Sequence, residues 1–350
     1  MEPVRLGVLG CGVIGRKHVQ VAADSPLLTP VAVADVRETV AHEVAEQHGV
    51  AQAYNSAEAL FADPDVEAVV LALPTAGRYI LALQAFAAGK HVLVEKPIGM
   101  SAAEVRQMIA ARGDLISGCC SSRMRGLESA KAATEFITSG ALGNLRVVRS
   151  RALRGAGEPP QNPPPPWRLN KAMNGGGILV NWGCYDLDYV LGITGWALRP
   201  RTVLAQTWNV PEAFSAYAAP GSDAEAHVTA LIRCDDNIAL NFERAEFVAS
   251  ATDEAWQVLG DRGALRLKMT PGASKQIWHD AATPRGVVSE VIWQGDEAPG
   301  SEHVYVLENF AQAVREQRAP RTSLEQALLV QQLTDAIYAS AAGRAAVTIA

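Results

Sequence analysis

The stretch VRLGVLGCGVIGRKH, residues 4–18, decides how the first part of the chain folds. Val4–Gly10 is a short apolar run that ends in glycine, as buried strands do, and Val13–Ala23 has the pattern of a helix. Between them, Gly10-Cys11-Gly12-Val13-Ile14-Gly15 fits G-x-G-x-x-G in the strand–turn–helix context that this motif requires. The stretch therefore predicts a turn that binds a dinucleotide.

Each glycine of the motif has a separate physical task. Gly10 permits the tight turn, Gly12 lets the backbone approach a pyrophosphate, and Gly15 allows the helix to pack closely on the strand. Val13 and Ile14 begin the helix, whose free N–H groups and positive dipole end favour phosphates. Alone the motif is weak, because glycine-rich turns also serve purely structural ends.

Asp35 strengthens the prediction. It ends a second strand, PVAVAD, and it follows Gly15 by 20 residues. A carboxylate at this point accepts hydrogen bonds from the adenosine ribose and repels a 2′-phosphate, which favours NAD. An Asp that only caps the next helix is the structural alternative. Arg37 keeps NADP possible, since an arginine pairs with a 2′-phosphate, and methyltransferases share the loop and the acid.

Strand and helix patterns alternate from this motif to about residue 121, which predicts a parallel sheet with helices on both faces. Ser101 with Glu104 three residues later forms a capping box that opens one of the helices. We expect a Rossmann domain over residues 1–121. The expected strands are 4–10, 30–35, 67–73 and 91–94, and the expected helices are 13–23, 38–48 and 79–88.

The pattern changes beyond residue 121. Five strand-like segments between residues 201 and 268 follow one another without helices, which predicts a mostly antiparallel sheet in an α+β domain over residues 122–302. Residues 303–350 return to helical periodicity and should pack back on the first domain. The segment GEPPQNPPPP, residues 157–166, holds six of the 19 prolines and is either a stiff connection or a loop over a cleft.

Composition excludes several classes of protein. The chain has 350 residues, 49% of them hydrophobic, and a net charge of −6, which argues against nucleic acid as a partner. No apolar run approaches a membrane span, and the N-terminus lacks the pattern of a signal peptide. The five cysteines are scattered and predict neither disulfides nor a metal site. We expect a cytoplasmic protein.

HVLVEKP, residues 91–97, ends a buried strand with a charged pair and a proline. A lysine at the carboxyl edge of a parallel sheet faces the ligand crevice. Lys96 is therefore a candidate for chemistry, although most lysines are simply solvated.

Several motifs together resemble the glucose–fructose oxidoreductase / inositol dehydrogenase family, Gfo/Idh/MocA. The resemblance covers nearly the whole length and rests on GCGVIGRKH, AAGKHVLVEKPIG, GALGNLRVVRS, GGGILVNWGCYDLD, SLEQAL and AIYASA. It implies a Rossmann domain, an open-faced sheet domain and a cleft between them for a sugar or polyol, and it disfavours a methyltransferase. Relatives cover the open sheet face with another subunit, so a homodimer or homotetramer is expected.

The resemblance also implies roles for individual residues. Lys96 would contact the reacting hydroxyl and the nicotinamide ribose, and Glu95 would lie beside that ribose. The turn at Pro74 and Thr75 is assigned to the cofactor site as well.

The segment Gly175–Asp188 departs from the family at two positions. Many members have D-x-G-x-H-x-x-D, where this chain has Asn181 and Tyr185 followed by Asp188. In a helix these three positions share one face. Either activity is lost or altered, or Tyr185 replaces the histidine as proton-transfer group. We prefer the second, because a phenol, which titrates near about 10 when free, is shifted towards phenolate by a nearby ammonium such as that of Lys96.

All but one of the remaining substrate candidates have a structural alternative. Asn181 keeps hydrogen-bonding capacity but is also a good helix N-cap. Arg123 and Arg168 are candidates to anchor hydroxyls or surface ion-pair partners. Trp167 and Trp182 would stack on a sugar or lie in the core. Asp188 would orient the substrate or Lys96.

The prediction is an NAD(P)-dependent oxidoreductase that interconverts a secondary alcohol and a ketone on a sugar-like substrate. One alternative is an NADPH-dependent reductase of an amino sugar, for which Glu212, Asp223 and Glu225 would attract the cation. Another is a non-catalytic dinucleotide-binding regulator, against which Lys96 argues.

Overall fold

The computed structural model describes residues 2–162 and 164–349, so Pro163 of the proline-rich segment lies outside the described residues. The chain divides into two compact units. The first consists of Met1–Arg123 and Glu302–Gln331, and the second of Met124–Ser301 and Gln332–Ala350. The domain bounds 1–121, 122–302 and 303–350 stay a prediction, because compactness does not test whether a segment folds by itself.

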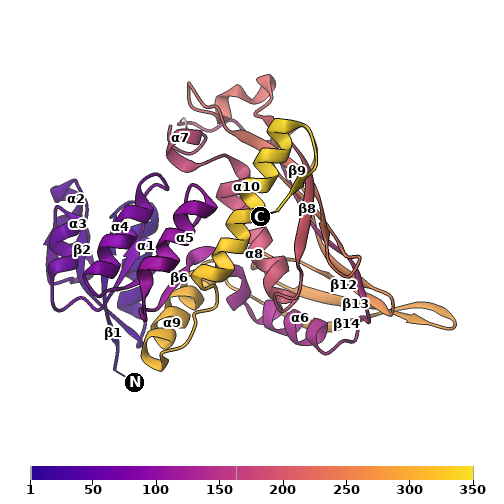
Figure 1. Cartoon of the computed structure of the whole chain (residues 1–350), viewed down its shortest axis with the longest axis horizontal. Helices are drawn as coiled ribbons and strands as arrows, with labels where there is room; N and C mark the ends of the chain where they lie inside the picture. Colours follow the sequence, from indigo (N-terminus) through magenta and orange to yellow (C-terminus); the bar gives the residue numbers. More distant parts are fainter. Residues whose placement is uncertain (1, 163, 350) are drawn as a thin grey trace. The chain divides into compact units, whose positions relative to one another are not determined.

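The first unit is built on a six-stranded sheet in the order β3-β2-β1-β4-β5-β6. Figure 1 labels β1, β2 and β6 among its strands. All its pairings are parallel, as predicted. The order reverses between β1 and β4, which is the point where such sheets bind ligands beyond the carboxyl ends of their strands. The strands are β1 Val4–Leu9, β2 Leu28–Ala34, β3 Gln52–Tyr54, β4 Ala68–Leu71, β5 His91–Val94 and β6 Ser117–Cys119.

Helices cover both faces of this sheet. One apolar core joins α1, α2 and α9 to the strands, and a second core joins α3, α4, α5 and the start of α10. The helix α9 comes from the end of the chain and contributes Leu307 and Phe310 to the first core. The bounds are α1 Val13–Asp24, α2 Glu38–His48, α3 Ala57–Ala62, α4 Arg78–Ala87, α5 Ala102–Arg112, the 3-10 helix η1 Cys120–Gly126, α9 Ser301–Glu316 and α10 Leu324–Gly343.

The predicted cap of α5 is confirmed. Ser101 is the N-cap, and its hydroxyl accepts the N–H of Glu104 at 3.4 Å. The Glu104 carboxylate reaches back to the N–H of Met100 at 2.7 Å, one residue earlier than in the standard reciprocal box.

The second unit contains a nine-stranded sheet in the order β14-β13-β12-β11-β7-β10-β9-β8-β15. Its pairings are antiparallel except that between β7 and β10, so the prediction of a large, mostly antiparallel sheet is confirmed. The strands are β7 Leu145–Gly155, β8 Pro200–Asn209, β9 Glu225–Cys234, β10 Ala239–Val248, β11 Asp253–Gly260, β12 Gly263–Leu267, β13 Lys275–Thr283, β14 Gly286–Gly295 and β15 Val347–Thr348.

The two faces of this sheet differ. Helix α8 contacts β7, and α6 contacts β13 and β14, which buries alternate side chains such as Val148 and Ser150. On β8 and β9, the large apolar side chains of Leu204, Trp208 and Leu231 are about half exposed. The remaining helices are α6 Glu128–Thr138, α7 Lys171–Asn174, the π-helix η2 Leu179–Gly183, α8 Cys184–Ile193 and the 3-10 helix η3 Glu212–Tyr217.

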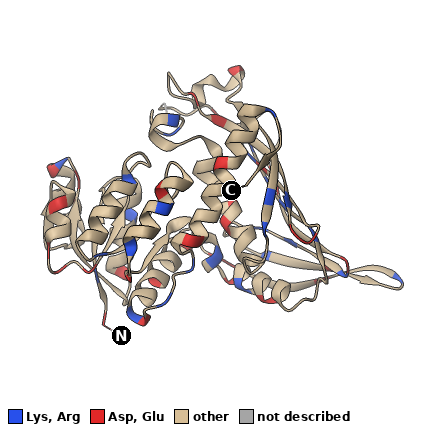
Figure 2. Cartoon of the chain, viewed as in Figure 1, with Lys and Arg blue, Asp and Glu red and all other residues tan. Residues whose placement is uncertain are grey.

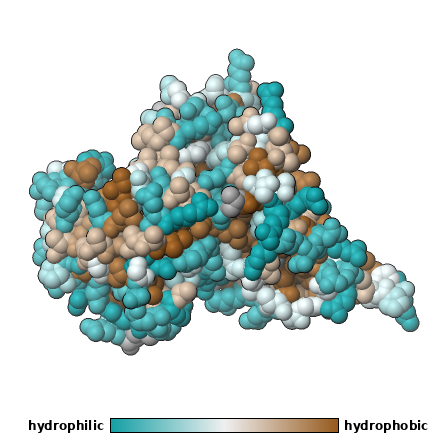
Figure 3. All heavy atoms as spheres, viewed as in Figure 1, coloured by the Kyte–Doolittle hydropathy of each residue, from teal (hydrophilic) through white to brown (hydrophobic). Residues whose placement is uncertain are grey.

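Acidic and basic residues are mixed along both units in the view of Figure 2, as the modest net charge of −6 leads one to expect. Hydrophobic residues interrupt the polar surface in the same view (Figure 3). No helix within residues 2–162 and 164–349 combines the length and apolarity needed to cross a lipid bilayer.

Candidate functional site

The glycine turn of the first unit has the geometry that its motif predicts. Gly10 has a φ of 97°, and a Cβ there would lie 2.4 Å from the carbonyl oxygen of Ala72. A Cβ on Gly15 would lie 1.7 Å from the oxygen of Gly10, so only glycine lets α1 approach β1. Around Gly12, by contrast, a Cβ would meet no described atom within 4 Å. The turn thus leaves open space where a pyrophosphate would approach.

The start of α1 fits a phosphate ligand in two further ways. Its N-cap, Gly12, offers no side chain to the first N–H groups of the helix. Val13, the first helical residue, is 93% exposed, while Ile14 is partly buried against the core. Open N–H groups beside an uncovered apolar residue suit a dinucleotide, whose phosphates need donors and whose rings cover apolar surface.

Asp35 follows the last residue of β2 and points its carboxylate at this turn. Its Oδ2 accepts the N–H of Cys11 at 2.9 Å, and its Oδ1 accepts the N–H of Arg37 at 3.0 Å. Burial raises the pKa of this carboxyl, but these N–H donors and the Arg37 guanidinium outweigh it, so the pKa lies below its ordinary value. Helix α2 has Arg37 as its N-cap, so Asp35 is not the capping residue of that helix.

Glu95 is the centre of a buried charge network at the end of β5. Its Oε1 lies 2.7 Å from Nε2 of His18 and also pairs with the guanidinium of Arg123. Its Oε2 accepts the backbone N–H of Lys96 at 3.0 Å. Burial opposes ionisation, but Arg123 and His18 hold the pKa of Glu95 well below its ordinary value. The carboxylate is therefore charged and fixes the backbone from which Lys96 extends.

His303, from the start of α9, borders the same network. Burial lowers its pKa to about 3, and the positive charges of Arg123 and His18 act in the same direction. Its imidazole is therefore neutral near neutral pH. Its Nε2 lies 3.6 Å from a carboxylate oxygen of Glu302.

One group of side chains in the described residues has atoms close enough for a metal ion. His18, Glu95 and Cys120 place possible ligand atoms within 4.8 Å of one another. Burial, followed by the charge of Glu95, raises the pKa of the Cys120 thiol well above its ordinary value, whereas a metal needs the thiolate. Because Arg123 already pairs with Glu95, the group suits an ion-pair network better than a cation.

The turn at Pro74 and Thr75 follows β4. Pro74 is exposed and Thr75 is buried. The buried Arg78 stabilises this turn, since its Nη1 donates to the carbonyl of Leu73 at 2.7 Å and its Nη2 donates to that of Pro97. Arg78 thus links the turn to the segment that carries Lys96.

In the second unit, Asn181 and Trp182 lie in η2, and Tyr185 lies in the first turn of α8, which continues it. The helix starts at Leu179, with Ile178 as its N-cap, so the N-cap alternative for Asn181 is wrong. The spacing rule that would place residues 181 and 185 on one face holds for an α-helix. Residue 181 instead lies in the wider π turn, and the α-helix begins only at Cys184. Tyr185 is 4% exposed and meets Trp182 edge to face at 5.6 Å.

Glu225 on β9 holds the start of this helix. Its carboxylate accepts the N–H groups of Gly177 and Leu179 at 3.0 Å and the hydroxyl of Tyr338 at 2.8 Å. A Cβ on Gly176 would lie 1.8 Å from the Tyr338 hydroxyl, and a Cβ on Gly177 equally close to the Glu225 backbone oxygen. Glu225 is 2% exposed and already bonded, so it does not offer the free carboxylate expected for an amino sugar.

Two more buried carboxylates fix α8. Asp186 accepts from the indole N–H of Trp256 at 3.2 Å and lies 3.4 Å from Nε of Arg244. Asp188, 0% exposed, accepts from Nε of Arg125 at 2.6 Å. Burial raises the pKa of Asp186, with the Arg244 charge opposing it.

The other substrate candidates lie in different surroundings. Arg123 is buried against Glu95 in the first unit, so its surface ion-pair alternative is wrong. Trp167 is 40% exposed, which excludes its core alternative. Trp182 is partly buried, and Arg168, which pairs with Glu246, lines a cavity of about 300 Å³ beside it.

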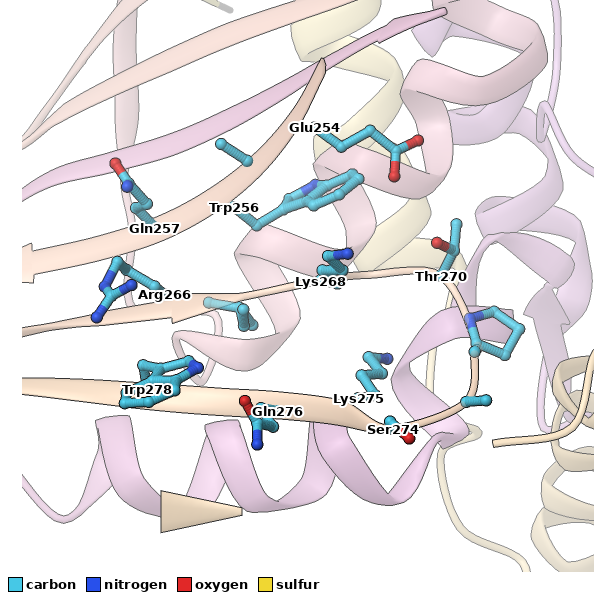
Figure 4. Close-up of a pocket in the computed structure, with 15 residues that line it drawn as sticks. Glu254, Trp256, Gln257, Arg266, Lys268, Thr270, Ser274, Lys275, Gln276 and Trp278 are labelled. Carbon is cyan, nitrogen blue, oxygen red and sulfur yellow. The ribbon is translucent and has the colours of Figure 1, made fainter. Parts of the chain in front are cut away.

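A second hollow of about 480 Å³ lies over β11, β12 and β13 (Figure 4). The loop carrying Thr270 and Ser274 closes one side of it, and Trp278 forms part of its wall. Two of its cations are paired: Arg266 makes two hydrogen bonds to Asp280, and Lys275 pairs with Glu297 at 2.6 Å. These paired groups stabilise the sheet, and the hollow holds none of the predicted site residues.

Sequence reasoning missed Arg154, Arg244, Glu246 and His303. None of them belongs to a local motif, and each reaches its place through tertiary packing. The pairing of β7 with β10 brings residues 154 and 244 to one end of the sheet. Only the unusual density of arginine in LRVVRSRALRG, residues 145–155, was a usable signal.

Comparison with protein families finds two matches along the chain. The model of an oxidoreductase family with an NAD-binding Rossmann fold, GFO_IDH_MocA, matches residues 4–114. The model of the GFO/IDH/MocA C-terminal domain matches residues 130–266.

Curated relatives and solved structures agree with these matches. D-glucoside 3-dehydrogenase of Escherichia coli is 26% identical over 97% of this chain and 96% of that protein. Myo-inositol 2-dehydrogenase of Thermotoga maritima is 32% identical, over 54% of this chain and 55% of that protein. The structure of levoglucosan dehydrogenase with NADH and L-sorbose superposes with a TM-score of 0.84 over 100% of both chains at 19% identity. An oxidoreductase domain protein of Kribbella flavida gives 0.85 at 21% identity, again over both whole chains. At these identities the structural matches show the fold.

The neutral His303 predicts a specific pH dependence of stability. Its folded-state pKa of about 3 lies below the unfolded value of about 6.5, so the unfolded chain binds more protons between these limits. Stability should therefore fall as pH decreases from 6.5 towards 3, by at most about 1.4 kcal/mol per pH unit from this group. His303→Gln should remove that part of the slope, measured by urea unfolding between pH 5 and 7. His42→Gln, at an exposed position on α2, is the control, and equal slopes for wild type and His303→Gln would contradict the prediction.

Proposed function

The chain belongs to the Gfo/Idh/MocA oxidoreductase family, and from this premise we propose that it oxidises a secondary alcohol of a sugar or polyol with NAD. The observation that carries the cofactor part is the open turn at Gly12 together with the Asp35 carboxylate that borders it. Sugar-like substrates are supported by relatives that are named glucoside, levoglucosan and inositol dehydrogenases.

Different residues of the first unit would hold different parts of the cofactor. The N–H groups at the start of α1 bind the pyrophosphate, and Asp35 accepts from the adenosine ribose. Pro74 and Thr75 line the nicotinamide side, and Glu95 keeps Lys96 in place beside the nicotinamide ribose. Bound NAD supplies the acceptor for the hydride that leaves the carbinol carbon.

Tyr185 and Lys96 would handle the proton. As the C–H bond breaks, the substrate hydroxyl gives its proton to the Tyr185 oxygen, and the carbonyl forms. Lys96 donates a hydrogen bond to the same substrate oxygen and favours the phenolate. Asn181, Trp182, Arg123, Trp167, Arg168 and Asp188 are assigned to binding and orienting the substrate or the groups that contact it.

The activity has a direct test. The purified protein is mixed with NAD and a panel of sugars and polyols, and absorbance of NADH is followed. A non-catalytic regulator would bind NAD and give no NADH with any member of the panel. No observation favours the amino-sugar alternative, since Glu225 is engaged and Asp223 accepts from the N–H of Lys171.

Asp35 predicts the choice of cofactor. Its charge repels a 2′-phosphate, so NAD should bind more tightly than NADP, and Asp35→Ser should relax or reverse the ratio. Titration calorimetry of both cofactors gives this ratio of affinities. Asp35→Ser also removes the hydrogen bond from Cys11, but a loss of binding from that cause affects both cofactors and cancels in the ratio. Equal affinities in the unaltered protein would refute the prediction.

The proton-transfer pair predicts non-additive losses. Tyr185→Phe and Lys96→Ala should each lower kcat by roughly 10² to 10⁴, and the double variant should be little worse than the worse single one. Tyr185→His should keep partial activity with a lower pH optimum, because imidazole titrates near about 6.5 and phenol near about 10.

Tyr189→Phe is the matched control, since Tyr189 lies one turn further on α8 and is fully buried. Steady-state kcat against pH for all five variants is the measurement. Near-full activity of Tyr185→Phe would mean that Tyr185 is only a packing residue.

The exposed apolar residues of β8 and β9 predict an oligomer. Leu204, Trp208 and Leu231 project from neighbouring strands, and such a patch is a liability in a monomer. We expect a homodimer or homotetramer by light scattering at micromolar concentration. Leu204→Glu with Leu231→Glu should shift the mass towards the monomer, whereas a monomeric unaltered protein would exclude the idea.

A further inference from the structure

The cavity beside Trp182 lies at one end of the sheet of the second unit. Its volume of about 300 Å³ is at the lower end of the range of about 300 to 1,000 Å³ typical of small-molecule sites, so it suits a single sugar ring or a part of one. Aromatic side chains of Trp182, Tyr217 and Phe247 form much of its wall. Trp182 also touches Tyr185, which connects the cavity with the proposed proton-transfer group.

Three arginines line this cavity: Arg154, Arg168 and Arg244. Arg244 lies 4.8 Å from the centre of the Trp182 ring, and Arg154 lies 5.8 Å from the same ring. Two guanidinium groups thus share one indole, although like charges repel each other when held close. Such an arrangement is costly unless an anion lies nearby.

The carboxylates around the cavity compensate only part of this charge. Glu246 pairs with Arg168, and Asp186 lies behind Arg244. Burial raises the pKa of Glu246, with Arg168 opposing it, and the charges of Arg244 and Arg154 act on the same carboxylate, so one carboxylate faces three arginines. Within residues 2–162 and 164–349, Arg154 has no ion pair and Nη1 of the 2% exposed Arg244 has no hydrogen-bond partner.

A purely structural role explains two of the three arginines. Arg168 neutralises Glu246, and Arg244 neutralises Asp186, because a buried carboxylate is costly without a partner of opposite charge. It explains Arg154 less well, because Arg154 is exposed at the end of β7 and lies over Trp182. Its charge acts on Glu246, but within the described residues it makes no ion pair with that carboxylate, which pairs with Arg168. The guanidinium fork binds carboxylates and phosphates through two parallel hydrogen bonds, which points to a ligand that carries one of these groups.

From this excess of positive charge, we infer that the cavity binds an oxyanion substituent of the substrate, so that the chain acts on an acidic sugar rather than a neutral one. The inference rests on the proposed function for the reaction itself. The shared chemistry is a carboxylate or a phosphate attached to a sugar. Aromatic walls receive the apolar face of the ring, and Arg154 with Arg168 receives the anion.

The test compares matched ligands in each of two series: glucose, glucuronate and glucose 6-phosphate, and galactose, galacturonate and galactose 6-phosphate. Binding to the full-length protein with NADH is measured by calorimetry, and turnover with NAD is measured separately. At least one acid should bind about 10- to 100-fold more tightly than its neutral counterpart, the range expected for one charge-assisted hydrogen bond. Preference for the hexuronate identifies a carboxylate site, and preference for the ester identifies a phosphate site.

Arg154→Gln should erase this preference by weakening the binding of the acids more than that of the neutral sugars, whereas Arg154→Lys should restore part of it. Arg151→Gln is the matched control, because Arg151 lies on the opposite face of β7 and pairs with Asp253. The inference is overturned if no acid binds better than its neutral partner, or if the two glutamine variants behave alike. NADH formation from neutral sugars alone would overturn the inference while upholding the proposed function. Arg154-dependent binding of acids with no turnover of any sugar would uphold the anion-binding cavity and overturn the proposed function.

Discussion

The carboxylate of Glu225 holds together the part of the second unit on which the proposed chemistry depends. From β9 it accepts the N–H groups of Gly177 and Leu179, and from α10 it accepts the hydroxyl of Tyr338. These bonds fix where the helical segment begins. They therefore also fix its rotation about the helix axis, and with it the directions in which Trp182 and Tyr185 extend. The unusual π turn between Leu179 and Gly183 follows directly after this anchor.

The first unit uses a buried carboxylate in a related way. Glu95 accepts the backbone N–H of Lys96 while His18 and Arg123 hold its charge. In both units, therefore, an ionised or polar carboxyl group binds the backbone of the segment that bears a proposed reactive side chain. Buried ion pairs contribute little net stability compared with apolar contacts, but they orient their partners strictly. Orientation is what a lysine and a tyrosine need if they are to act on one substrate atom.

The sequence allowed the first unit to be predicted well because its signals are local. Gly10, Gly12 and Gly15 are each required by the local geometry of one turn, and Asp35 follows at a spacing set by one helix and one strand. Strand β3 and helix α3 escaped prediction because a three-residue strand and a six-residue helix are too short to show a period. For the large sheet, consecutive strand patterns predicted antiparallel pairing but gave no sign that β7 would insert in parallel beside β10.

The site of the second unit was predictable only where it follows a motif. Tyr185 and Asn181 stand out because they replace residues common in relatives, whereas the π turn depends on contacts with β9 and α10. Two of the three arginines of the cavity, Arg154 and Arg244, are about 90 positions apart in the chain, and strand pairing brings them together. A charge cluster of this kind has no spacing rule, since its members share neither a helix turn nor a loop.

The crowding at Gly176 and Gly177 also determines which changes the chain tolerates. A side chain at either position would occupy the space of the Tyr338 hydroxyl or of the β9 backbone. In a saturation-mutagenesis screen, both codons would reject substitution as firmly as a codon for a reactive residue, although neither glycine needs to touch a reactant. A map of tolerated substitutions would thus show a glycine pair that reports on the packing of α10 and β9. Enlarging Gly176 would require shortening Tyr338 at the same time, whereas Gly177 faces the backbone of Glu225, which no side-chain change can move away.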